Sequence, residues 1–291
     1  MIFVDAHHHL WDLNACHYPW LEARGVQRFF GDPSPIQTDY LLEDFLNESK
    51  RYRPIKSVHI QVGVAPGYEL SESEWITQRH SKPEALVCFE DLSHPDFPTR
   101  LMKQQQLARV KGVRQIIGRH PVEDRQHNSD QLLENTAFNL GLKHLARSGM
   151  SFDLQLIPQQ HLRAARLLKD IESLPVAICH AGSPWDQSPE GLAAWRAGLQ
   201  ALAQRADTVI KISGLGMFNR SWSVDALSNI VYPVIDIFGP TRVMVGSNFP
   251  VDKLYHSYTE WWQAIETLLE RYTAPERHAM LVDTASRFYG I

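Results

Sequence analysis

The sequence predicts an α/β fold, a single (β/α)8 TIM-type barrel. Three observations support this fold class. Short apolar segments alternate with amphipathic ones along the chain, eight of the apolar segments have strand length, and no Pro/Gly/Ser-rich linker separates them. One domain spanning residues 1–291 is therefore expected. The alternative is an open, doubly wound sheet. No GxGxxG segment follows the first strand, so dinucleotide binding has no support.

The expected strands end at short polar or turn-forming segments. They cover residues 2–6, 57–62, 85–90, 109–114, 151–156, 176–180, 208–213 and 243–247. The helices expected among and after them cover residues 39–50, 73–81, 98–107, 130–148, 158–172, 189–206, 223–238, 258–272 and 275–288. Pro158 suits the first turn of a helix because its missing N–H is not needed there, and Gly149 suits the end of one.

Two long irregular segments follow expected strands. Residues 14–38, rich in Pro, Gly and aromatic residues, follow the first strand, and residues 118–129 follow the fourth. Barrel enzymes place their chemistry in the loops after strands, so these segments, together with residues 216–222, are expected to determine specificity.

Composition narrows the classes of function. The chain is 44% hydrophobic and 21% charged, with a net charge of −4. It has no long basic run, which argues against nucleic acid as a partner. It also has no apolar stretch of about 20 residues, which argues against a membrane span. Its first residues lack the pattern of a secretory signal, and its three cysteines are too few for a disulfide framework. We expect a cytoplasmic protein that acts on a small molecule, with homo-oligomerisation left open.

Histidines mark the end of the first strand. Because strand side chains alternate between faces, His7 and His9 should point the same way and His8 the opposite way. Two imidazoles in this arrangement form half of a divalent-metal site, for which zinc is the expected ion. His180 closes the sixth expected strand, and a barrel brings strand ends together, so His180 is expected near the other two.

Six short motifs occur in an order that resembles a known family. They are His7-His8-His9-Leu10-Trp11, Lys111-Gly112-Val113-Arg114, Phe152-Asp153-Leu154, His180-Ala181-Gly182, Lys211-Ile212-Ser213-Gly214-Leu215 and Gly246-Ser247-Asn248-Phe249-Pro250-Val251. Together they resemble the amidohydrolase-2 family of the amidohydrolase superfamily. More narrowly, they resemble its lactonase-type group, which includes L-fuconolactonase, rhamnonolactonase, sulfomuconolactonase and 2-pyrone-4,6-dicarboxylate lactonase.

The resemblance implies roles for individual residues. His7, His9 and His180 match the metal ligands or carbonyl-orienting groups of the family, and Arg114 matches an arginine that holds the substrate. Arg119 is a further candidate for that role. The implied cofactor is a divalent metal, although some relatives are thought to work without one.

The last-strand position departs from the family pattern. The family usually has an aspartate there, which acts as the base, whereas this chain has Asn248, and an amide is not basic at neutral pH. Three accounts stay open. Asp252 replaces the base, His180 is the base while Asn248 positions the water, or hydrolysis is lost.

Other polar residues on the strands have two interpretations each. His59 and Gln155 are candidates for substrate binding or for buried structural groups. Lys211 is a candidate for polarising a substrate or for a structural ion pair, and Asp153 for supporting a histidine. The leading hypothesis is a hydrolase that opens a small polar lactone, from a sugar acid or an aromatic-degradation intermediate, to the hydroxy acid. The alternatives are a metal-dependent decarboxylase of the same family and a non-catalytic ligand-binding barrel.

Overall fold

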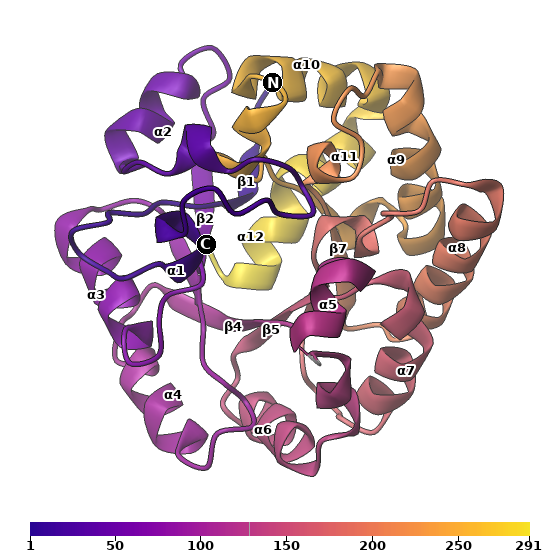
Figure 1. Cartoon of the computed structure of the whole chain (residues 1–291). Coiled ribbons are helices and arrows are strands. Elements are labelled where there is room, and N and C mark those ends of the chain that lie inside the picture. The colour runs from indigo at the N-terminus through magenta and orange to yellow at the C-terminus, as the bar shows by residue number, and fades with distance from the viewer. Residues whose placement is uncertain (128) are drawn as a thin grey trace.

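The fold is a barrel of eight parallel strands ringed by helices (Figure 1), as the sequence predicts. The computed structural model describes residues 1–127 and 129–291. The strands pair in sequence order, each with the next. They are β1 (Val4–His8), β2 (Lys56–Ile60), β3 (Ala85–Cys88), β4 (Val110–Ile116), β5 (Ser151–Gln155), β6 (Val176–Ile178), β7 (Thr208–Ile212) and β8 (Val243–Val245).

The first and last strands meet at a close seam. The backbone N–H of Asn248 donates to the carbonyl oxygen of His7 at 2.7 Å. The backbone N–H of His9 donates to the carbonyl oxygen of Phe249 at 2.8 Å. A Cβ atom at Gly246 would lie 2.5 Å from the Cβ of His7, so only glycine permits this approach. The seam brings the histidines at the end of β1 beside Asn248.

The main helices follow the strands as expected, with shifted ends. They are α2 (Leu42–Glu48), α3 (Glu69–Arg79), α4 (Phe97–Gln105), α6 (Thr136–Arg147), α7 (Pro158–Lys169), α8 (Pro189–Ala203), α9 (Val224–Phe238), α10 (Tyr258–Leu269), α11 (Ala274–His278) and α12 (Thr284–Tyr289). The helix expected over residues 130–148 begins later, because the side chain of Asn135 caps it by accepting from the N–H groups of Ala137 and Phe138.

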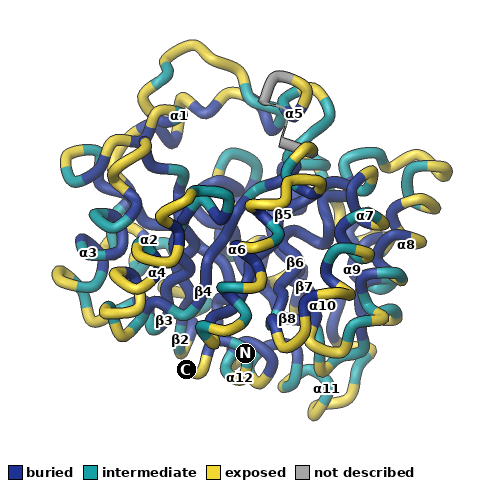
Figure 2. Tube along the Cα trace, turned by 90° about the horizontal axis from the view of Figure 1, so that it is seen from below, coloured by how far each residue is buried: buried dark blue, intermediate teal, exposed yellow. Residues whose placement is uncertain are grey.

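Two helices lie within segments that the sequence left irregular. These are α1 (Pro19–Glu22) and α5 (Pro121–His127). Figure 2 shows both standing at one end of the barrel, opposite the end that carries the two termini. Asn128, which belongs to the irregular segment predicted over residues 118–129, lies outside the described residues.

The core has an inner and an outer part. Inside the barrel, small and medium apolar side chains such as Val4, Ala6 and Val58 pack with Tyr289 of α12. Between sheet and helices lies a larger cluster with many aromatic side chains, including Trp195 and Trp262. Successive side chains of a strand therefore point alternately into the barrel and toward the helices, as in a filled barrel with an outer helical layer. No helix in the described part of the chain is long and apolar enough to cross a membrane.

Candidate active site

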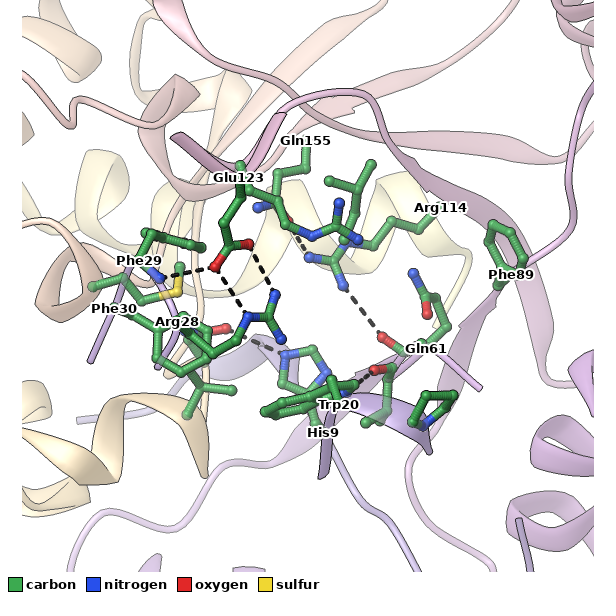
Figure 3. Close-up of a pocket in the computed structure, with 18 of the residues that line it drawn as sticks. His9, Trp20, Arg28, Phe29, Phe30, Gln61, Phe89, Arg114, Glu123 and Gln155 are labelled. Atoms are coloured by element: carbon green, nitrogen blue, oxygen red, sulfur yellow. Dashed lines mark hydrogen bonds and ion pairs between the residues drawn. The ribbon is translucent and has the colours of Figure 1, made fainter. Parts of the chain in front are cut away.

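A cavity of about 660 Å³ is lined in part by residues of α1 and α5, among them Trp20 and Glu123 (Figure 3). Its floor includes residues at the ends of strands, and its walls come from the loops after them. Six of the residues predicted for the site line it, namely His9, Arg114, Arg119, Gln155, His180 and Asn248. The structure therefore brings to one space side chains that are up to 239 positions apart in the sequence.

Three buried imidazoles lie together at this cavity, and two of them, those of His9 and His180, line it. The ring centroids of His7 and His9 are 5.1 Å apart, and those of His7 and His180 are 4.5 Å apart. His8 points the other way and stacks on Phe45 of α2 with 4.1 Å between ring centroids, as strand alternation predicts.

Burial keeps these histidines neutral at pH 7. It lowers the pKa of His9 to about 3, with the nearby Arg114 guanidinium adding to the effect. Burial also lowers the pKa of His7 and of His180 well below the ordinary value, and the positive charges of Lys211 and Arg114 reinforce this. Each ring therefore keeps a nitrogen lone pair that can bind a cation or accept a proton.

Hydrogen bonds decide which nitrogen carries the lone pair of His9. Its Nδ1 lies 2.7 Å from the carbonyl oxygen of Ile60, which only accepts, so Nδ1 carries the hydrogen. Its Nε2 then faces Oδ1 of Asn248 at 3.3 Å with no hydrogen between them. In His180, Nδ1 is hydrogen-bonded to the hydroxyl of Ser213 at 3.0 Å, which leaves Nε2 for the cavity.

Asp252 lies behind Asn248, away from the cavity. Its Oδ1 accepts a hydrogen bond from Nδ2 of Asn248 at 3.1 Å, and its Oδ2 lies 3.6 Å from Nε2 of His256. Asp252 is fully buried and is not among the lining residues. The carboxylate thus fixes the orientation of the Asn248 amide, with the amide oxygen turned to His9.

Arg114 is held on two sides. Its Nη1 donates to the carbonyl oxygen of Gln61 at 3.2 Å, and its Nη2 donates to Oε1 of Gln155. Its buried Nε–H has no partner in the described part of the structure. These two hydrogen bonds hold the guanidinium in one orientation (Figure 3).

The structure places His59 and Lys211 away from the cavity. His59 accepts from the N–H of Leu10 at 3.2 Å and lies 4.0 Å from Glu72 of α3, against the helical layer. Lys211 lies inside the barrel with Nζ 2.5 Å from Oδ2 of Asp153, the structural ion pair that was one of its two interpretations. Asp153 also accepts from the hydroxyl of Tyr289 at 2.9 Å.

Several lining residues carry no signal in the sequence. Arg28 forms a two-pronged ion pair with Glu123 at 3.0 Å for each bond, across 95 positions of sequence (Figure 3). Aromatic rings from the segment 14–38, including Trp20 and Phe29, form one wall. These residues belong to the segments 14–38 and 118–129, which were expected to determine specificity. The pairing of Arg28 with Glu123 could not be predicted, because it depends on the position of helix α5 in the fold.

A divalent metal finds suitable donors here. Within residues 1–127 and 129–291, no group of three or more His, Cys, Asp and Glu side chains is arranged to hold an ion. However, His9 Nε2 and Asn248 Oδ1 are two acceptors 3.3 Å apart. That separation is the edge of a tetrahedron with bonds of about 2.0–2.1 Å, the usual length for zinc with nitrogen or oxygen ligands. A cation held by these two atoms would remove the repulsion of their two facing lone pairs.

Comparison with known proteins identifies the family. The amidohydrolase family matches residues 4–291. The chain belongs to the amidohydrolase family. It is a hydrolase, as the resemblance implies. An uncharacterized protein, y4mH, of Sinorhizobium fredii is 35% identical over 292 residues, covering 99% of this chain and 98% of the relative. An L-fucono-1,5-lactonase of Burkholderia multivorans is 27% identical over 303 residues, covering 99% and 96%. This similarity supports the lactonase-type group.

Solved structures share the fold of this amidohydrolase. A crystal structure of an amidohydrolase from Burkholderia multivorans with bound zinc has a TM-score of 0.85 at 24% identity, and both chains are covered completely. A 5-carboxyvanillate decarboxylase from Sphingomonas paucimobilis has a TM-score of 0.65 at 12% identity, covering 100% of this chain and 99% of that one. These likenesses concern the barrel alone.

Proposed function

We propose that this amidohydrolase opens a small polar lactone to its hydroxy acid. The observation that carries the proposal is the convergence of His9, His180 and Asn248 on one cavity that also holds the rigidly placed Arg114. Neutral imidazoles, an amide and a guanidinium suit a reaction in which a carbonyl oxygen gains negative charge while water loses a proton. The similarity to an L-fucono-1,5-lactonase supports a cyclic ester as the substrate.

His180 is the proposed base. It lines the cavity, its Nδ1 is hydrogen-bonded to Ser213, and its Nε2 has no hydrogen-bond partner among the described residues. Water attacks the lactone carbonyl carbon as its proton passes to Nε2. The ring C–O bond then breaks, and the proton returns to the leaving oxygen, which becomes the hydroxyl of the product. Asn248 positions the water through its amide, in the orientation that Asp252 imposes.

A base role for Asp252 is less well supported. Its Oδ1 is already engaged by Asn248, and the side chain does not line the cavity. In the proposed mechanism Asp252 is a positioning residue, which acts through Asn248. Arg114, which lines the cavity and is hydrogen-bonded to Gln155, is the proposed substrate-binding cation.

The amidohydrolase family typically depends on a divalent metal, and one structural neighbour holds zinc. His9 Nε2 and Asn248 Oδ1 would hold such an ion, with His7 as the nearest further imidazole, and His180 completes the predicted set of histidines. When bound, the ion supplies Lewis acidity at the substrate carbonyl and lowers the pKa of bound water.

A pH-indicator assay over sugar-acid and muconate-type lactones tests the proposal, run with and without a chelator. Wild-type protein is expected to release protons faster than the spontaneous reaction. His180→Ala should lower that rate by about 10²–10⁴-fold, the usual contribution of a general base. His278→Ala, which changes a half-exposed histidine on α11, is the matched control and should leave it unchanged.

Two outcomes contradict the proposal. Ligand binding without turnover across the panel indicates a non-catalytic barrel. Release of CO₂ from aromatic acids, with no lactone opened, indicates the decarboxylase that a structural neighbour exemplifies.

A further inference from the structure

The charge inside the cavity differs in sign from that of the whole chain. Among the described residues that line it, the charged ones are Arg28, Arg114, Arg119 and Glu123. Three guanidinium groups against one carboxylate leave an excess of two positive charges, in a protein with a net charge of −4. Such a concave positive site in a negatively charged protein concentrates anions.

Glu123 is fully engaged by one of the three arginines. Both of its oxygens accept from Arg28 at 3.0 Å, and one of them also accepts from the N–H of Phe29 at 2.8 Å. This pair ties the segment 14–38 to α5 and neutralises Arg28. The excess charge therefore resides on Arg114 and Arg119.

Among the described residues, the guanidinium group of Arg119 has no hydrogen-bond or ion-pair partner. The carboxylate of Asp124 accepts from the backbone N–H of Arg119 at 2.9 Å, not from its side chain. In the described part of the chain, no hydrogen bond or ion pair engages the guanidinium, although the residue is half-buried and lines the cavity. Burial and the charges of Arg28 and Arg114 lower the pKa of Arg119 to about 10, so it remains charged at pH 7.

A half-buried cation beside two others is costly unless an anion meets it. The nearby carboxylates of Glu123 and Asp124 favour its charged form, but among the described residues neither forms a hydrogen bond or ion pair with its guanidinium. The donor fork of Arg119 suits the two oxygens of a further carboxylate. Aromatic side chains also line the cavity, among them Trp20, Phe29 and Phe89. A flat ring carrying a carboxylate complements both features.

We propose that the cavity takes a lactone bearing a carboxylate, and that Arg119 binds this carboxylate. The inference rests on the proposed lactone hydrolysis and narrows its substrate class to acidic lactones in place of neutral sugar lactones. Arg119 acts in binding and selection, while the carbonyl end of the substrate lies at His9, His180 and Asn248.

Equilibrium binding tests the subsite without any turnover. The probes are 2-furoate, a flat ring carboxylate without a lactone, and 2-furamide, its neutral counterpart, titrated calorimetrically into wild-type protein. Furoate is expected to bind about ten- to a hundredfold more tightly, the range of a hydrogen bond to a charged group. Arg119→Gln should abolish the difference, and Arg119→Lys should retain part of it. Arg125→Gln, an exposed arginine of α5, is the matched control.

Turnover provides the second readout. A five-membered unsaturated lactone with a carboxymethyl group is compared with its methyl ester, which removes the charge and keeps the ring. The ratio of the two kcat/KM values should favour the acid in wild type and fall at least tenfold in Arg119→Gln. Equal rates for acid and ester, or equal binding of furoate and furamide, overturn the acidic-substrate inference. Binding of furoate through Arg119 with no lactone opened overturns the lactonase proposal and leaves the anion subsite standing.

Discussion

Nδ2 of Asn248 donates to Oδ1 of Asp252 at 3.1 Å, and this hydrogen bond turns the amide oxygen of Asn248 to His9. The reverse orientation would set an amide oxygen against a carboxylate. Asp252 therefore determines that the oxygen of the Asn248 amide faces His9, although Asp252 itself does not line the cavity.

Two substitutions of Asp252 separate positioning from proton transfer. Asp252→Asn keeps an oxygen that accepts from Asn248, and its new N–H group can donate to His256, so kcat should fall less than about tenfold. Asp252→Ala removes the acceptor and should lower kcat further than Asp252→Asn does. If Asp252 were the base, Asp252→Asn alone would lose about 10²–10⁴-fold. Steady-state kinetics of both variants across the pH range decide between the two roles.

Ser213 should matter to kcat more than to KM. Its hydroxyl is hydrogen-bonded to Nδ1 of His180 at 3.0 Å and orients the ring. Loss of one such bond is worth about 1 kcal/mol, so Ser213→Ala should lower kcat about fivefold. The change in KM should be small because Ser213 does not line the cavity. A change confined to KM would show that His180 contributes to binding instead.

Metal content should depend on Asn248. Purified protein is expected to contain a divalent ion by elemental analysis, and chelation should lower turnover. Asn248→Ala removes one of the two facing acceptors and should weaken metal affinity by at least the roughly 10–100-fold effect of disturbing a metal-site partner. Gln115→Ala, which changes a cavity residue whose amide is hydrogen-bonded to Leu92 and Asp91, serves as the control. Equal metal content in wild type and Asn248→Ala would remove the amide from the ligand set.

Glu72 should make stability depend on pH. Burial raises the pKa of Glu72 to about 8, whereas in the unfolded chain it is about 4.3. Between these values the native state holds a proton that the unfolded state has lost, so stability falls as pH rises. The slope should approach about 1.4 kcal/mol per pH unit between pH 5 and 8.

Glu72→Gln replaces the neutral acid with a neutral amide and should lack this slope. Urea unfolding at several pH values measures the difference between the two proteins. Glu43→Gln, at an exposed position on α2, should follow wild type throughout. Parallel curves for wild type and Glu72→Gln would show that the carboxyl is already ionised at pH 5.

The seam between β1 and β8 should not tolerate a side chain at Gly246. An added Cβ would lie 2.6 Å from the backbone nitrogen of His7, which belongs to a strand and cannot move freely. Gly246→Ala should therefore destabilise the fold by about 1–3 kcal/mol, the usual cost of overpacking. Gly239→Ala has no atom within 4 Å of the added Cβ and tests the cost of its positive φ alone. Denaturant unfolding compares the two.

The barrel could be predicted because its signal is repeated eight times. Each strand was anticipated to within a few residues, since apolar runs and the spacing of helices constrain one another. The helix expected to start at residue 73 begins at Glu69, four positions earlier. Its first turn is largely polar, so hydrophobic periodicity did not detect it.

The site was harder to predict than the fold. Alternation in β1 correctly separated His8 from its neighbours, but the sixth strand ends at Ile178 instead of continuing to His180. The direction of Asp252 depends on a short turn after β8, and the partner of Arg28 depends on a helix absent from the prediction. These features come from tertiary contacts between distant segments, which periodicity in one sequence does not encode.

Two site residues occupy backbone conformations that glycine would adopt more easily. His180 has φ 52° and Asn248 has φ 57°, both left-handed. Such conformations cost a non-glycine residue roughly 1 kcal/mol or more each. Selection for thermal stability alone would thus favour glycine at these two positions and erase the proposed base and its amide partner. In a library screened only for folding, the most robust variants should be enriched in inactive proteins.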